Sequence, residues 1–262
     1  MMIFLLLLIG VLSVAFITLI ERKVLGLRQI RFGPNKLSLA GLFQPVMDGI
    51  KLLSKTYFDS KLRIISLLGP LGVMFLFLIN WTFLFWLGIG VLIKATLFLL
   101  IICLGLLSYS VIITRWTVTS TFPKLGLIRS LLQSLSYEVS LVSVLLIVGS
   151  TLQLIGLKRE LSYIIIIWLV SWILILLIDC NRAPFDLLEG ERELISGFNT
   201  EINRLGFIFL FLGEYGMILV LSTLLIHYIK IRYFLCMLLL LISLISRRVY
   251  PRIRYDIITI FI

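Results

Sequence analysis

The sequence predicts an all-α protein, a polytopic transmembrane helical bundle of about seven spans with an amphipathic helix at the membrane surface. Of its 262 residues, 61% are hydrophobic and only 14% are charged. The mean hydropathy is +1.16, and the apolar share exceeds that of a water-soluble domain. Several apolar runs approach the roughly 20 residues that cross a bilayer as a helix. Because these runs are continuous in Leu and Ile, they fit helices rather than the alternating strands of a membrane barrel.

The expected spans follow one another along a single membrane domain, residues 1–262. They cover about Met1 to Ile20, Ile64 to Phe83, Leu92 to Thr114, Leu135 to Ile155, Leu161 to Ile178, Leu205 to Ile229 and Tyr233 to Ile245. Lys and Arg are more frequent in loops on the inner side of a membrane. Of the 24 Lys and Arg residues, 19 fall on the side that holds the loops after spans one, three and five and the C-terminus. We therefore expect the N-terminus to face outward and to carry no cleavable presequence.

The first inner loop, residues 21–63, should contain a helix of its own. Gly33-Pro34-Asn35 indicates a turn. After it, apolar residues recur at helical spacing, namely Leu42, Val46, Ile50, Leu53 and Tyr57. A second stripe of the same helix is polar and consists of Gln44, Asp48, Lys51 and Lys55. Amphipathicity alone favours an anchor in the lipid surface over a binding element.

Two acidic residues fall inside predicted spans. Glu138 lies near the start of the fourth, and Glu214 lies about 13 Å inside the sixth if that helix begins near Leu205. A charged carboxylate at such depth costs roughly 2.5 to 3.5 kcal/mol. Each carboxyl should therefore be neutral, as in a proton relay, paired across helices as a structural contact, or exposed to water. Beside Glu214, Gly213 and Gly216 allow either a kink or close helix packing.

The inner loop after the fifth span, residues 179–204, is acidic within a chain of net charge +11. Its acids are Asp179, Asp186, Glu189, Glu191, Glu193 and Glu201, and its cations are Arg182, Arg192 and Arg204. Pro184 ends the preceding helix near Asn181. Repulsion among the acids favours sequential proton uptake. An equally weighted alternative is a solvated loop that docks on a basic partner surface.

Composition excludes several classes of site and partner. Cys103, Cys180 and Cys236 share no CxxC spacing, and His227 is the single histidine. A haem, zinc or iron-sulfur site built by this chain alone is therefore not expected. The positive net charge reflects the bias of the inner loops and contact with anionic lipids such as cardiolipin. Nucleic acid is not an expected partner, because there is no basic soluble domain to bind it.

Six strings carry a resemblance to a known family over nearly the whole chain. In order, they are ERKVLGLRQIRFGPN (21–35), QPVMDGIKLLSK (44–55), RSLLQSLSYEV (129–139), NRAPFDLLEGERELISGFNTE (181–201), GEYG (213–216) and YPRIRYD (250–256). The chain thereby resembles NADH dehydrogenase subunit 1, the quinone-channel membrane subunit of respiratory complex I. The combination of NRAPFD and SYEV is highly specific.

The resemblance implies a subunit of a proton-translocating NADH:ubiquinone reductase that holds no complete active site. Its inner loops would join soluble quinone-site and iron-sulfur subunits around a cavity for ubiquinone. NADH, FMN and the iron-sulfur clusters would bind in those partners, and this chain would bind no cofactor of its own. Quinone reduction would then act on a carboxylate path that leads to antiporter-like membrane subunits.

The resemblance also assigns individual residues. Those at the quinone cavity and its entrance are Gln29, Arg31, Asp48 and Lys51. Those of the proton path are Glu138, Asp179, Asp186, Glu189, Glu191, Glu193, Glu201 and Glu214, with Arg129, Arg182 and Arg252 as charge partners. Three positions depart from the family pattern, namely Asp179, Arg192 and Thr56. The family continues into an eighth C-terminal span beyond the point where this chain ends, so we expect that span to be lost or supplied by a partner.

Compartment and competing functions follow from weaker signals. The chain has only four alanines, a bias that resembles an AT-rich organellar genome and favours the mitochondrial inner membrane over the alternative, a bacterial plasma membrane. One alternative function is the membrane subunit of a related quinone- or hydrogenase-linked complex. Another is an autonomous proton-coupled transporter, although no internal repeat is found. A purely structural anchor would need no carboxylates inside its spans.

Overall fold

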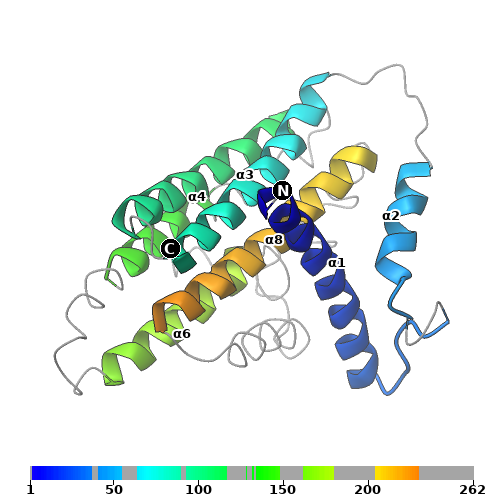
Figure 1. Cartoon of the computed structure of the whole chain (residues 1–262), viewed down its shortest axis with the longest axis horizontal. Coiled ribbons are helices and arrows are strands. Elements are labelled where there is room, and N and C mark those ends of the chain that lie inside the picture. Colours follow the sequence, from blue (N-terminus) through cyan, green and yellow to red (C-terminus); the bar gives the residue numbers. More distant parts are fainter. Residues whose placement is uncertain are drawn as a thin grey trace.

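The computed structural model describes residues 2–36, 41–54, 64–89, 93–116, 128, 132, 134–147, 162–179 and 204–229. The regular elements in these ranges are α-helices, as predicted. They are α1 (Met2–Arg28), α2 (Gln44–Ser54), α3 (Ile64–Ile89), α4 (Ile93–Trp116), a helix at Ser134–Ile147, α6 (Ser162–Asp179) and α8 (Arg204–Ile229). Figure 1 shows α3 and α4 lying along one another, α8 beside them, and α1 leaning away toward α2.

Four segments in these ranges are long and apolar enough to cross a membrane. They are Met2–Arg28, Leu67–Gly88, Ala95–Ile113 and Leu205–Leu224, and they coincide with the first, second, third and sixth predicted spans. The shorter Ser134–Ile147 helix falls within the predicted fourth span, and α6 coincides with the fifth. The predicted seventh span, Tyr233–Ile245, lies outside the described residues. The prediction of a helical membrane bundle is confirmed.

The first helix is longer than its hydropathy indicates. The predicted span ends at Ile20, but α1 continues to Arg28. The segment ERKVLGLR consists largely of good helix formers, and Arg28 lies in the last turn, where a cation interacts favourably with the helix dipole. The helical extension carries Glu21 into the bundle, where its side chain is only 8% exposed.

A Schellman motif ends α1, with an unusual residue at its centre. The Arg31 amide donates to the Gly26 carbonyl at 3.1 Å, and the Ile30 amide donates to the Leu27 carbonyl at 3.1 Å. Ile30 has φ 55°, a left-handed conformation that this motif normally assigns to glycine. A β-branched side chain is disfavoured there. Ile30 is 98% exposed, so no packing compensates for the strain.

Helix α8 is the centre of the bundle. In the most apolar 18-residue stretch of Leu205–Leu224, 61% of the residues are buried, against 22 to 33% in the corresponding stretches of the other three spanning helices. Gly213 lies against Val73 of α3, and Gly216 lies against the Phe77 ring, each too close to admit a Cβ atom without a shift. Small residues of this kind let membrane helices approach closely. Of the two roles that the sequence left open for these glycines, the contacts support close packing.

The contacts also give the helix directions. Val73 and Phe77 meet Gly213 and Gly216 in increasing order, so α3 and α8 run parallel. This is the relation that spans two and six of an alternating bundle must have. At the α3–α4 contact, a Cβ on Gly72 would lie 3.3 Å from the Ser110 Cβ.

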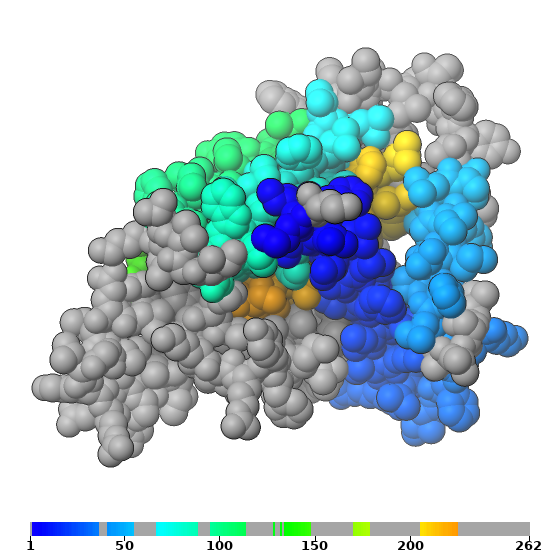
Figure 2. Space-filling view, in the orientation of Figure 1, coloured from blue at the N-terminus to red at the C-terminus, as the bar shows by residue number. Residues whose placement is uncertain are grey.

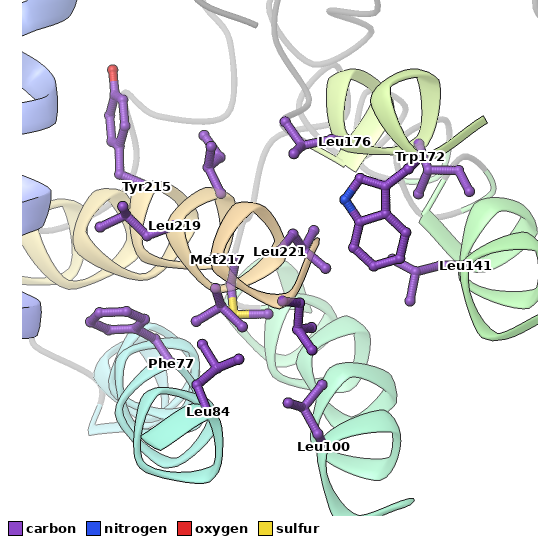
Figure 3. Close-up of a cluster of buried hydrophobic side chains, with 14 of the residues drawn as sticks. Phe77, Leu84, Leu100, Leu141, Trp172, Leu176, Tyr215, Met217, Leu219 and Leu221 are labelled. Carbon is purple, nitrogen blue, oxygen red and sulfur yellow. The ribbon is translucent and has the colours of Figure 1, made fainter. Parts of the chain in front are cut away.

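The apolar core joins α8 to the surrounding helices. Figure 3 shows Phe77, Leu84 and Leu100 on one side of α8, with Trp172 near Leu141 farther along. Tyr215 belongs to the same cluster but lies on the opposite side of α8 from Phe77, and its hydroxyl points away from the apolar side chains. The side of α8 that carries Tyr215 therefore presents a polar group to its surroundings.

Replacing Ile30 with glycine should stabilise the end of α1. A left-handed conformation costs a non-glycine residue roughly 1–2 kcal/mol, part of which is offset by the greater backbone entropy that glycine loses on folding. We expect Ile30→Gly to raise stability by about 0.5–1 kcal/mol, seen as a higher midpoint of thermal unfolding. The matched control is Ile9→Gly, also at an exposed isoleucine but inside α1. It should lower stability by about 1 kcal/mol. A lower midpoint for both variants would contradict the strain at Ile30.

Adding one methyl group at the α3–α8 contact should separate these helices. Gly216→Ala places a Cβ inside the Phe77 ring contact, and overpacking of this kind costs about 1–3 kcal/mol. We expect less assembled protein in the membrane and a lower midpoint of thermal unfolding. Gly49→Ala in α2 is the control, because a Cβ there meets nothing within 4 Å. Equal behaviour of the two alanine variants would contradict the packing role of Gly216.

Candidate functional site

Glu138, predicted as an intramembrane acid, lies against α4. A Cβ on Gly105 would be 2.6 Å from the Glu138 Oε1 atom, so the absent side chain leaves the space that the carboxyl occupies. Glu138 is hydrogen-bonded to the Ser108 side chain. The Ser108 hydroxyl also lies 2.8 Å from the Gly105 carbonyl oxygen, to which it can donate. One turn of α4 thus supplies both the room and a polar partner for the carboxyl group.

Glu21 is a further acid in the bundle and is more deeply buried than Glu138, and the sequence analysis did not identify it. Its carboxylate accepts a hydrogen bond of 2.5 Å from the Tyr215 hydroxyl, which joins α1 to α8. Both side chains are buried, at 8% and 6% exposure. Hydropathy suggests that Glu21 begins the inner loop, because the apolar run ends one residue earlier. The spacing of the buried α1 residues Gly10, Val14, Ile17 and Glu21 is the signal that could have placed it in the bundle.

Glu214 lies on α8 between two packed residues. Gly213 faces α3 through Val73, and Tyr215 faces α1 through Glu21. Successive residues of a helix point about 100° apart. Glu214 therefore points in a third direction, away from both contacts, and is partly buried.

The helix contacts place these acids at one level of the bundle. Gly213 of α8 lies at Val73 of α3, and the neighbouring Gly72 of α3 lies at Ser110 of α4. Glu214, which follows Gly213, is therefore level with Ser110. Glu138 lies at Gly105 of α4, only five residues from Ser110. Five residues of a helix span roughly 8 Å. We call Glu21, Glu138, Glu214, Ser108 and Tyr215 the polar layer.

A second cluster joins α1 to the surface helix. Arg22 Nη1 and Asp48 Oδ2 form an ion pair at 2.5 Å, and Gln44 Nε2 donates to Asp48 Oδ1 at 3.1 Å. The Arg22 and Asp48 side chains are 52% and 34% exposed. Solvent screens such a pair, and it contributes about 0–1 kcal/mol. Figure 2 shows α1 in dark blue and α2 in light blue lying side by side on this face.

The other residues predicted at the quinone entrance are exposed. Gln29 and Arg31 lie in the turn after α1, and Lys51 lies on α2. Gly33 permits this turn, because a Cβ there would lie 3.2 Å from the Lys23 Cα atom. The chain after α1 therefore folds back along its last turns. Asp48 is the member of this predicted set that takes part in the ion pair described above.

Most of the predicted acidic loop lies outside the described residues. Asp179 is the last residue of α6. Asp186, Glu189, Glu191, Glu193 and Glu201 lie in the undescribed ranges, as do Arg129, Arg182 and Arg252. Among the side chains that the structure does describe, no group of three His, Cys, Asp or Glu could hold a metal ion.

The polar layer combines groups that can hold and exchange protons. Two of its three carboxyl groups have hydroxyl neighbours, Tyr215 at Glu21 and Ser108 at Glu138. Ionisable residues in the interior of a membrane bundle are costly and usually mark a proton or ion pathway. In chemical terms, the arrangement fits proton transfer between carboxyl groups.

Comparison with known proteins identifies the family of this chain. The sequence matches the NADH dehydrogenase family over residues 1–262. It is 38% identical to NADH-ubiquinone oxidoreductase chain 1 of Artemia franciscana, over 93% of this chain and 86% of that protein. The same chain 1 of Anopheles gambiae is 39% identical, over 93% and 83% of the two chains. That of Apis mellifera ligustica is 35% identical, over 93% and 85%. The chain therefore belongs to the NADH dehydrogenase family.

Proposed function

We propose that this chain is the core membrane subunit of a proton-pumping NADH:ubiquinone oxidoreductase. The observation that carries the proposal is the family match along the whole chain, together with relatives named as chain 1 of that enzyme. The buried Glu21 and the partly buried Glu138 and Glu214 support it independently, because a plain anchor has no need of carboxyl groups in its bundle. We place the protein in the mitochondrial inner membrane, in keeping with its animal relatives and its alanine-poor composition.

The chain acts within a larger assembly. Its partners would be soluble quinone-site and iron-sulfur subunits, antiporter-like membrane subunits and anionic lipids such as cardiolipin. The substrate is ubiquinone, which takes up two electrons and two protons to become the quinol. NADH, FMN and iron-sulfur clusters would be held by the partner subunits, and this chain would supply part of the cavity in which the quinone is reduced.

The surface helix and the turn after α1 would form the entrance for the quinone. Gln29, Arg31 and Lys51 offer exposed polar and cationic groups there, and Asp48 is held by Arg22. Large apolar side chains on the same elements are exposed as well, among them Leu27, Phe32, Phe43, Met47 and Ile50. A mixture of exposed apolar and polar groups suits a lipid-soluble ring that carries two carbonyl oxygens.

The polar layer would form the start of the carboxylate path. Glu138 lies against α4, and Glu214 lies next to the α8 residue that packs on α3, at a similar level of the bundle. Loss of negative charge from the cavity on quinone protonation alters the electrostatic field at both carboxyl groups, and a poorly screened interior transmits that change over several ångströms. Asp179, Asp186, Glu189, Glu191, Glu193 and Glu201 would connect the cavity to this layer, with Arg129, Arg182 and Arg252 balancing their charge.

Removing one ionisable carboxyl should uncouple the enzyme while leaving it assembled. Glu214→Gln keeps the shape and polarity of the side chain but cannot release a proton. We expect NADH-driven proton pumping in the intact complex to fall at least about tenfold, the lower range for loss of a positioned proton-transfer group. NADH oxidation with ubiquinone should fall less than pumping, so that fewer protons are pumped for each NADH oxidised.

The control is Glu160→Gln, in the predicted outer loop between spans four and five, where no role in the path is assigned. It should pump as well as the unchanged complex. If Glu214→Gln assembles and pumps normally, the carboxyl group is structural and this proton path is misplaced. Normal pumping by both Glu214→Gln and Glu138→Gln would remove the polar layer from the mechanism altogether.

A further inference from the structure

Two adjacent residues near the inner end of α1 face two different helices. Glu21 accepts the hydrogen bond of Tyr215 on α8, and Arg22 forms the ion pair with Asp48 on α2. Neighbouring helix residues point about 100° apart, so one turn of α1 can contact both helices at once. Two rotatable side chains on one rigid helix therefore connect the surface helix to the centre of the bundle.

The ion pair is one of the contacts that hold α2, which touches both α1 and α8. Within the described chain, no residue of α2 is buried. Apolar packing therefore does little to fix the helix, whose side chains Val46, Met47, Ile50 and Leu53 are all about half exposed. Asp48 is held from two sides, by Arg22 of α1 and by Gln44 of α2 itself. A weak, partly solvated ion pair of this kind can be remade when α2 moves.

The other end of the connection is rigid. Tyr215 is buried and lies between Glu214 and Gly216 in the sequence, and Gly216 is packed on Phe77. Helix α8 cannot rotate at this level without separating from α3. A displacement of the end of α1 must therefore change the Glu21–Tyr215 hydrogen bond rather than the position of α8. The loss or lengthening of that hydrogen bond affects Tyr215, the residue that directly follows Glu214.

We propose that Glu21 and Arg22 are positioning residues that couple the surface helix to the Glu214 region of α8. A displacement of α2, such as the arrival of a quinone head group would cause, passes through Arg22 and Glu21 to Tyr215. The inference rests on the proposed function and adds to it the route by which the entrance and the proton path sense each other. Coupling of this kind is a measurable free energy shared by the two ends.

A double-mutant cycle between Asp48 and Tyr215 tests the route. The variants Asp48→Asn, Tyr215→Phe and their combination are made in the intact complex. Two quantities are measured for each: KM for a short-chain ubiquinone, and the number of protons pumped per NADH oxidised. Asp48→Asn should raise KM and Tyr215→Phe should lower the pumping ratio. In KM, the effect of the combined variant should depart from the product of the two single effects by about threefold or more.

Two controls separate coupling from general loosening of the fold. Tyr109→Phe removes the hydroxyl of an exposed tyrosine on α4, and its effect should simply multiply with that of Asp48→Asn. Arg22→Lys keeps the charge that faces Asp48, whereas Arg22→Gln removes it. The lysine variant should retain most of the unchanged KM, and the glutamine variant should reproduce the raised KM of Asp48→Asn. If Arg22 had a purely structural role, the lysine and glutamine variants would not differ in KM according to their charge.

The outcomes distinguish this inference from the proposed function. If each single variant has its expected effect but the effects simply multiply, the coupling route is wrong and the proposed function stands. If none of these variants changes KM or the pumping ratio, the proposed entrance fails and the coupling route fails with it. Should the combined variant not assemble, the cycle is repeated with Arg22→Gln in place of Asp48→Asn, and independent effects there overturn the route.

Discussion

The need to satisfy polar groups inside an apolar bundle governs the arrangement of this protein. The hydrogen bond between Tyr215 and Glu21 meets that need at the contact between α1 and α8, where both residues are buried. Leaving either group without a partner would cost about 1–3 kcal/mol, and more for the carboxylate. The contact therefore fixes how α1 leans on α8. Since Arg22 follows Glu21, it also fixes where Asp48 and α2 are held.

Glycines determine how closely the neighbouring helices approach this layer. Gly213 and Gly216 bring α8 onto α3, and Gly105 leaves room on α4 for the Glu138 carboxyl group. With larger residues at these positions, α8 would stand farther from α3, and the carboxyl of Glu138 would be displaced from Ser108. Missing side chains thus produce both features, the close packing at Gly213 and Gly216 and the space for a carboxyl group at Gly105.

The sequence predicted the helical class, most helix positions and the two acids inside spans, since hydropathy and an isolated charge are both local signals. It did not place Glu21 correctly. A window average ends the first span where ERK begins, and only the contact with Tyr215, 194 residues away, shows that α1 continues into the bundle. The ion pair of Arg22 with Asp48 is equally non-local. Assignments in the acidic loop, such as Glu193 and Glu201, lie outside the described residues and stay predictions.

The most direct test of this account is a high-resolution structure of the intact membrane complex that contains this chain. The account predicts that the Tyr215 hydroxyl oxygen lies within about 3 Å of a Glu21 carboxylate oxygen, with Arg22 on Asp48. Glu138 should lie over Gly105 at the same level. A structure with Glu21 turned out of the bundle into the inner aqueous loop, and Tyr215 paired elsewhere, would contradict the claim that this hydrogen bond organises the site.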